Sequence, residues 1–100
     1  MAVYTPTGPG TIKRVVLATT RRKVDLVNCS GPRWVRLFCT VECYLEIPGG
    51  DDGTALGTDY ETIPASTPTL RRIARNRTAF CISAQAGTPT CEISILSEEG

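Results

Sequence analysis

The sequence predicts an all-β domain, a small antiparallel β-sandwich or barrel of jelly-roll-like form. Short segments rich in alternating or β-branched apolar residues recur along the chain, and turn-forming residues separate them. No stretch of ten or more residues between these segments has the helical pattern that a βαβ plan requires. The chain has 100 residues, which suits one domain with one small core.

The first ten residues contain Thr5-Pro6 and Gly8-Pro9-Gly10 and show no side-chain period. Residues 1–10 are therefore predicted to form an extended N-terminal arm. A free tail and an arm that becomes ordered on a neighbouring subunit both fit this pattern, and free tails are the commoner case. We expect a single β domain over residues 11–96 and a polar C-terminal tail over residues 97–100.

Two strands are predicted in the next part of the chain. The apolar run Val15-Val16-Leu17 predicts a strand over residues 12–18. Residues 19–23 are polar and basic and favour a turn. Alternating apolar and polar residues over 24–28 then predict a short strand, which Ser30-Gly31-Pro32 ends.

The strongest pattern is a period of two over residues 34–47. Apolar residues occupy every odd position from Val35 to Ile47, and the even positions include Trp34, Phe38 and Tyr44. This predicts one long strand with a buried face, or two strands joined by a bulge. Because a sandwich buries one face of each sheet, the three aromatic residues either anchor a subunit interface or pack within the chain where the strand bends between sheets.

The C-terminal half predicts further strands. Residues 60–63 form a short strand in this interpretation. Residues 70–77 fit either an edge strand or two helical turns, and we favour the strand because the surrounding segments are all β. Residues 80–86 and 91–96 alternate and are separated by a Gly-containing loop, which predicts a β-hairpin.

The amino-acid composition argues against several classes of function. Eleven Lys and Arg against ten Asp and Glu give a formal net charge of +1, which excludes a protein that binds polyanions with its whole surface. The chain has no histidine, so it lacks the usual general base and the commonest metal ligand, and we expect no enzymatic activity and no cofactor. No apolar run approaches the roughly 20 residues of a membrane helix, and no secretory signal is visible at the N-terminus.

The five cysteines are an odd number, which favours reduced thiols in a cytoplasmic setting. On one regular strand, Cys39 and Cys43 would have Cα atoms about 13 Å apart, too far for a disulfide. Cys81 and Cys91 lie in the two arms of the predicted hairpin and form the intrachain pair to test. Neither the cysteine spacing nor Gly50-Asp51-Asp52-Gly53 matches a zinc or EF-hand pattern, so we expect no metal site and cysteines that act as small buried hydrophobic residues.

Arg71, Arg72, Arg75 and Arg77 form the most concentrated charge in the sequence. These four arginines are suited to contact phosphates, the carboxylates of a partner, or solvent. A small nucleic-acid-binding β-barrel that uses this segment is the competing hypothesis. Proteins that bind nucleic acid usually have a larger positive charge with aromatic residues interleaved, so nucleic-acid binding is disfavoured against a solvated or subunit-facing patch.

Three segments also carry a resemblance. They are Val24 to Cys39, the turn Ile63-Pro64-Ala65-Ser66-Thr67, and the alternating residues 78–95 with Gly87-Thr88 between the strands. Together, over about residues 24–96, they resemble the small all-β virion proteins of tailed bacteriophages, in which the turn reads IPAGT and Ser66 takes the place of the glycine.

The resemblance implies a virion structural protein without catalytic residues, made in the host cytoplasm. Its most specific form is a capsid decoration (cement) protein that binds the major capsid protein on the outer shell and fastens neighbouring capsomers, commonly as a trimer. A head–tail connector, neck or tail component is the nearest alternative. The residues expected at the partner interface are Trp34, Phe38, Tyr44, Arg71, Arg72, Arg75 and Arg77.

Overall fold

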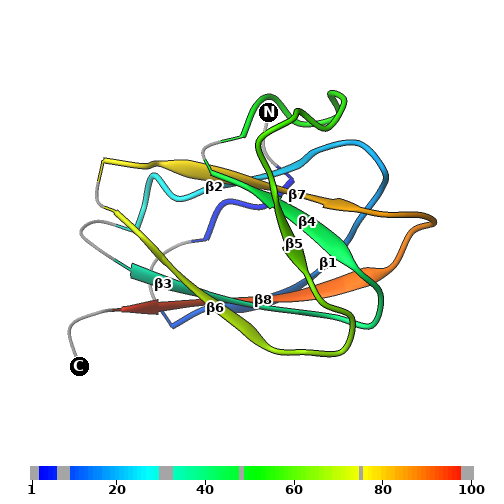
Figure 1. Ribbon diagram of the computed structural model, residues 1–100. Coiled ribbons are helices and arrows are strands. Elements are labelled where there is room, and N and C mark those ends of the chain that lie inside the picture. The colour runs from blue at the N-terminus through cyan, green and yellow to red at the C-terminus, as the bar shows by residue number, and fades with distance from the viewer. Residues whose placement is uncertain (1–2, 7–9, 30–32, 48, 75, 98–100) are drawn as a thin grey trace.

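The computed structural model describes residues 3–6, 10–29, 33–47, 49–74 and 76–97. Eight strands lie in this part of the chain, and no helix does. They are β1 (Ile12–Val16), β2 (Arg22–Asp25), β3 (Arg33–Cys39), β4 (Cys43–Glu46), β5 (Glu61–Ile63), β6 (Thr69–Ile73), β7 (Ala79–Ala84) and β8 (Thr90–Ser97). They form two four-stranded antiparallel sheets, in the orders β1-β8-β3-β6 and β2-β7-β4-β5, which pack face to face (Figure 1).

The strand pairing follows a simple rule that identifies the topology. β1 pairs with β8, β2 with β7, β3 with β6 and β4 with β5. The chain is thus arranged like one long hairpin, rolled up so that successive strand pairs alternate between the two sheets. This is a jelly roll, and the expected all-β sandwich of jelly-roll-like form is confirmed.

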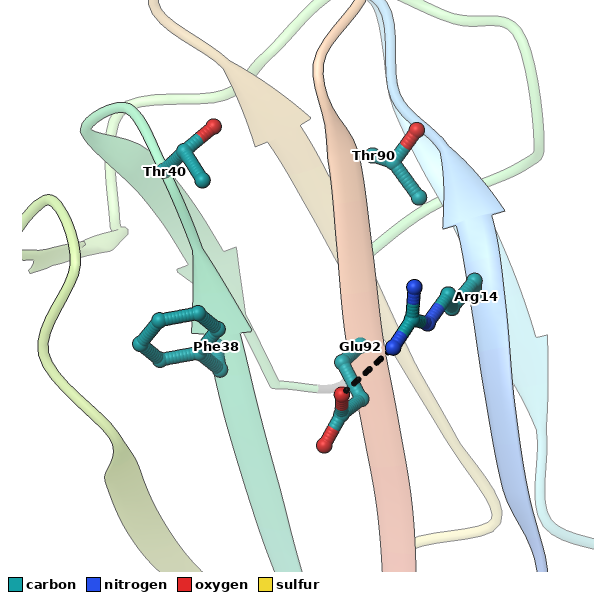
Figure 2. A pocket seen from close by; sticks show the side chains of 5 residues that line it. All are labelled: Arg14, Phe38, Thr40, Thr90 and Glu92. Carbon is teal, nitrogen blue, oxygen red and sulfur yellow. Dashed lines mark ion pairs between the residues drawn. The ribbon is translucent and has the colours of Figure 1, made fainter.

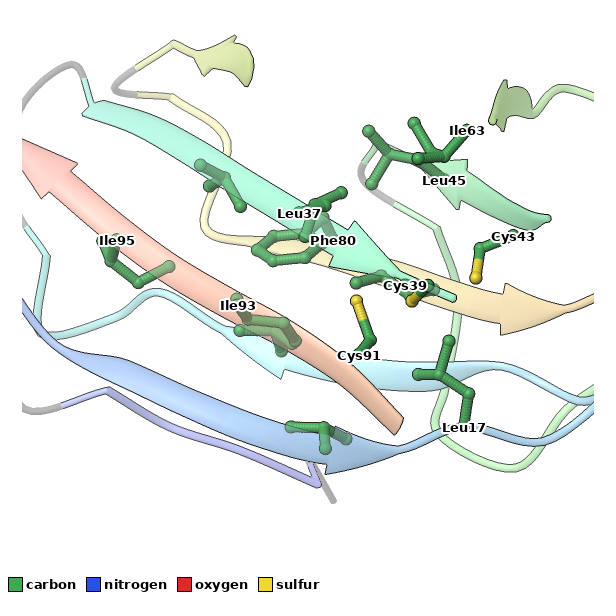
Figure 3. Packing of buried hydrophobic residues seen from close by; sticks show 14 of the residues in the cluster. Leu17, Leu37, Cys39, Cys43, Leu45, Ile63, Phe80, Cys91, Ile93 and Ile95 are labelled. Atoms are coloured by element: carbon green, nitrogen blue, oxygen red, sulfur yellow. The ribbon is translucent and has the colours of Figure 1, made fainter. Parts of the chain in front are cut away.

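The core lies between the sheets and is built from alternate residues of the strands, as the period of two requires. Leu37, Phe80, Ile93 and Ile95 gather there (Figure 3), and each is at most 1% exposed. Burying a side chain of this kind contributes about 1.5–3 kcal/mol. The two sheets are therefore held together mainly by apolar packing.

Of the two alternatives for residues 34–47, one long strand is wrong, and two strands form, although they lie in different sheets and are not joined by a bulge within one sheet. β3 ends at Cys39 and β4 begins at Cys43 in the opposite sheet, so the chain bends between sheets at residues 40–42. The alternation continues across the bend, and Cys39 and Cys43 are both buried while Val41 is exposed. A period of two shows which face is buried but does not show where the chain changes its pairing partners.

The two C-terminal strands form as expected, but the predicted hairpin between them does not. β7 pairs with β2 and β4, and β8 pairs with β1 and β3. Cys81 and Cys91 therefore lie in different sheets, and Cys91 instead lies opposite Cys39. The loop between the strands has a length that suits a hairpin or a crossover between sheets. Here the apolar residues of both strands are buried because the strands face each other across the core.

The strand predicted within residues 70–77 is present as β6, at the edge of its sheet. It ends at Ile73, so Arg77 lies beyond it, and Arg75 lies outside the described residues. The turn expected over residues 19–23 is shorter than predicted because β2 already begins at Arg22 and pairs with β7 from there.

Residues 3–6, within the predicted N-terminal arm, lie along the edge of β2 in the same chain. The amide of Val3 donates to the carbonyl of Lys23 at 2.8 Å, and the amide of Asp25 donates to the carbonyl of Tyr4 at 2.9 Å. Tyr4 and Val24 form a parallel bridge. Residues 1–2 and 7–9 of the arm and residues 98–100 of the tail lie outside the described residues.

Candidate functional site

On the outer face of the β1-β8-β3-β6 sheet, Val16 of β1 is 56% exposed near one end, and four other exposed apolar side chains, one on each strand, lie toward the other end. They are Ile12 (67% exposed), Trp34 (37%), Leu70 (49%) and Leu96 (39%). Trp34 lies directly opposite Leu96, and Ile12 and Leu70 lie in the adjacent cross-strand row. We call these four residues the apolar strip. Exposed apolar side chains on neighbouring strands are a mark of a contact surface when they adjoin one another.

Charged side chains accompany the apolar strip on the same face. Arg36 and Arg14 both contact Glu92, with Nη1 of Arg36 3.0 Å from Oε1 and Nη2 of Arg14 3.6 Å from Oε2. Arg72 projects beside Trp34, its direct cross-strand partner. Among the outward side chains described on these strands, three arginines and one glutamate give this face a net positive charge.

The structure places three of the predicted interface residues on this face, namely Trp34, Phe38 and Arg72. Tyr44 lies on the other sheet, in β4, and its ring centroid is 4.7 Å from that of Tyr60. The two tyrosine rings are tilted at 60°, so Tyr44 packs against a neighbour within its own chain. The aromatic residues of the alternating segment are thus divided between the two sheets.

The basic segment does not form one patch. Arg71 forms an ion pair with Glu61 of β5, with Nε 2.7 Å from Oε1, and this pair links the edge strands of the two sheets. Arg72 projects to the opposite side of the strand, as alternation requires. The carbonyl of Arg77 accepts a hydrogen bond from the buried guanidinium of Arg33.

Sequence reasoning missed most of the apolar strip and its charged neighbours. The sequence did indicate that Leu96 and Glu92 are exposed, because they occupy the even positions of the last predicted strand, which alternate with the apolar odd positions. Ile12 and Arg14 had a weaker one, since the continuous run Val15-Val16-Leu17 hides the alternation of β1. Leu70 lay in a segment whose secondary structure was ambiguous.

A pocket of about 310 Å³ lies at one end of this face. Arg14, Phe38, Thr40, Thr90 and Glu92 line it. In Figure 2, Phe38 stands on one side, the Arg14–Glu92 ion pair on the other, and the two threonines bound the remaining end. We call this the Phe38 pocket.

A second pocket, of about 360 Å³, lies beside the ion pair of Arg21 and Glu46. Both bonds of this bidentate pair are 2.9 Å long, and the two side chains are only 19% and 5% exposed. The amide of Gly57 also donates to Glu46 at 3.2 Å. A Cβ atom at Gly50 would lie 2.1 Å from Nη1 of Arg21, so the loop fits closely around the guanidinium. These charges are engaged with each other, and the pair fastens the loop to the sheet.

The Arg21 guanidinium, through its hydrogen bonds, holds the pKa of Glu46 below its usual value of about 4.5. The pair therefore adds to stability above about pH 5, and this contribution is lost as the pH falls through the lowered pKa. Replacing Glu46 by Gln is expected to lower the urea midpoint at neutral pH, with a difference from the wild type that shrinks as the pH is lowered toward about 3.

Glu61→Gln is the matched control, because it disrupts the Arg71–Glu61 pair, in which both side chains are 40% exposed. Exposed pairs contribute about 1 kcal/mol or less, so this variant is expected to stay close to the wild type. Urea midpoints of wild type and Glu46→Gln that run parallel from about pH 7 to 3 would show that the pair does not supply the pH dependence.

All five cysteines are buried and free. The bend between β3 and β4 brings Cys39 and Cys43 close together, so the separation expected on a regular strand does not apply. Hydrogen bonding to Cys43 and Cys91, together with burial, raises the pKa of Cys39. Cys81 points to the outer side of β7, where its thiol donates to the carbonyl of Gly50 at 3.2 Å. Among the residues that the structure describes, no group of three His, Cys, Asp or Glu is placed to hold a metal ion.

A scan of the sequence against models of known protein families finds no match, and a search among curated proteins finds no similar sequence. Within the described ranges, no helix has the length and apolar character needed to cross a bilayer.

Proposed function

We propose that this chain is a non-enzymatic structural protein of a tailed bacteriophage virion, a decoration protein that binds the outer capsid and stabilises contacts between capsomers. The observation that carries the proposal is the apolar strip, which lies across the four strands of one sheet and is accompanied by arginines. A face of this composition suits contact with another protein surface, since interface centres favour aromatic and apolar side chains together with Arg.

Two further features support the virion role. The turn that resembles the phage motif has a glycine in that family, and Ser66 at this position has a φ of 54°. This is the left-handed region that glycine favours, so the backbone has the shape that the family's glycine would allow. The jelly roll is also a recurrent fold of viral capsid domains, and this support is by analogy of fold.

The chemistry of the face indicates the partner. Trp34 is the largest side chain of the apolar strip and the anchor of the contact, and Arg72 beside it provides a charged contact at the rim. The complementary surface is apolar at its centre and acidic around it, and we assign it to the major capsid protein. A homotrimer is the favoured assembly, and a neck or tail component is the alternative position in the virion.

Replacing Trp34 by Ala tests this proposal. Loss of an aromatic anchor costs about 2 kcal/mol or more of binding free energy, so the affinity for the capsid is expected to fall at least about thirtyfold. The urea midpoint of the free protein is expected to change little, because Trp34 projects outward. The measurement is co-sedimentation of the purified protein with capsids of the phage that carries its gene, with light scattering to give its mass in solution.

Tyr60→Ala is the matched control, because it removes an exposed aromatic residue from the other side of the sandwich. It is expected to leave capsid binding unchanged. The proposal fails if the wild-type protein does not sediment with capsids, or if Trp34→Ala lowers stability more than binding. Micromolar binding to short DNA with a steep salt dependence would instead favour the nucleic-acid hypothesis.

A further inference from the structure

The Phe38 pocket is built by two neighbouring cross-strand rows at one end of the outer sheet face. Arg14 of β1, Glu92 of β8 and Phe38 of β3 lie directly opposite one another in one row. The next row contains Thr90, which lies opposite Val16 of β1 and lines the pocket together with Thr40, the residue after β3. The resulting volume, about 310 Å³, is at the lower end of the range of about 300–1,000 Å³ typical of small-molecule sites.

The groups that line the pocket differ in chemistry and balance in charge. Phe38 supplies an aromatic ring that is only half-buried, and Thr40 and Thr90 supply hydroxyl groups that both donate and accept. Glu92 supplies carboxylate oxygens at 29% exposure, and the Arg14 guanidinium is 76% exposed and held only by a 3.6 Å contact. The charges of the lining residues Arg14 and Glu92 cancel, but Arg36, 3.0 Å from Glu92, adds a positive charge beside the pocket. The choice of ligand therefore depends on the aromatic ring and the hydrogen-bonding groups, and a charged ligand has to be compared directly.

We propose that the Phe38 pocket binds a pyranose sugar. One side of a pyranose ring presents C–H groups, which pack against an aromatic ring, and its edge carries hydroxyl groups that donate to a carboxylate and accept from a guanidinium. An anionic ligand would meet the carboxylate of Glu92, and a cationic one would meet Arg14 and Arg36. A purely apolar ligand would remove water from the Arg14–Glu92 ion pair without adding a hydrogen bond to it.

The proposed sugar site can be tested separately from the proposed contact with the capsid. Phe38 and Trp34 project from the same face of β3, but they are four residues apart, which corresponds to about 13 Å along a strand. The apolar strip occupies the Trp34 row and the next row, which contains Ile12, and the Phe38 pocket adjoins it, because Arg14 is two residues from Ile12 on β1, about 7 Å along the strand. Sugar binding is therefore measured on the free protein, in the absence of capsids.

The test is a titration of the full-length, ¹⁵N-labelled protein followed by NMR. The probes are the methyl pyranosides of glucose, galactose, mannose and N-acetylglucosamine, with methyl glucuronide as a charged comparison. At least one neutral pyranoside is expected to cause saturable shifts in the amides of Phe38, Thr40, Thr90 and Glu92. Small ligands usually reach a limited binding free energy per non-hydrogen atom. For a ligand the size of one methyl pyranoside, this gives an expected dissociation constant of about 1 mM.

Three variants test the roles of the lining residues. Phe38→Ala is expected to weaken sugar binding at least about tenfold, because it removes the aromatic surface. Glu92→Gln keeps the shape of the side chain and removes its charge, and we expect about fivefold weaker binding. Thr90→Leu fills the pocket and is expected to abolish binding. Tyr60→Ala, which removes an aromatic ring that packs on Tyr44 of the other sheet, is expected to leave the titration unchanged.

Several results would overturn the proposal. One is the absence of saturable shifts at these amides with every neutral pyranoside at about 100 mM, a concentration about a hundred times the expected dissociation constant. Another is stronger binding of the glucuronide that depends on Arg14 alone, which would identify an anion site. If Phe38→Ala does not fold, Thr90→Leu and Glu92→Gln decide the question, and unchanged sugar affinity in both would place binding elsewhere. None of these results depends on whether the protein binds capsids.

Discussion

Replacing Phe80 by Ala is expected to lower the free energy of unfolding by about 4 kcal/mol. Phe80 has no exposed surface, and it lies between the two sheets among the central core residues (Figure 3). The deletion removes buried apolar area and leaves a cavity that the flanking strands cannot close, because each is fixed by hydrogen bonds to its neighbours. A domain of this size has a total stability of about 5–15 kcal/mol, so the variant loses a large part of it.

Urea unfolding at neutral pH measures this effect, and Phe80→Leu provides a milder step if the alanine variant does not fold. The matched control is Val27→Ala, since Val27 is an apolar residue outside the strands and is 64% exposed. The control is expected to change the free energy of unfolding by about 0.5 kcal/mol or less. A loss below about 1 kcal/mol for Phe80→Ala would contradict the central position of this ring.

The burial of the strand faces was predictable because it depends on local alternation. Val35, Leu37 and Cys39 were assigned to one buried face from their parity, and all three are buried. The pairing of strands was not predictable in the same way. The same alternation fits a continuous strand and a strand that crosses between sheets at residues 40–42. The difference depends on long-range pairing with β8 and β7, which local patterns do not contain.

The same reason explains why the candidate site was only partly predicted. Trp34 and Phe38 were found because they stand out within one alternating segment. The row of Arg14, Glu92 and Phe38 joins three strands that are distant in the sequence, and only the register brings them together. Arg71 appeared to be part of one basic patch, but its ion pair with Glu61 depends on two edge strands lying side by side.

The five buried cysteines are expected to be strongly protected from thiol reagents in the native protein. Each of the five thiols is at most 1% exposed, so a bulky thiol reagent reaches most of them only when the domain unfolds. For a domain with a stability of about 5 kcal/mol or more, this slows the reaction at least about a thousandfold relative to the unfolded chain. Burial also raises the pKa of Cys29 and Cys81, which lowers the fraction of reactive thiolate. We expect the native protein to react very slowly with dithiobis(nitrobenzoate).

The thiols are not expected to be equally protected. Cys39, Cys43 and Cys91 lie in the core between the sheets, whereas Cys81 lies on the outer side of β7 beneath Gly49 and Gly50. Because a loop opens at a lower free energy than a sheet, Cys81 is expected to react first, and Cys81→Ser is expected to remove this fastest phase. Mass spectrometry of partly labelled protein identifies the modified residue. Cys29 also belongs to the core cluster. A first modification at any of these four cysteines would show that the loop that covers Cys81 is not the first part of the domain to open.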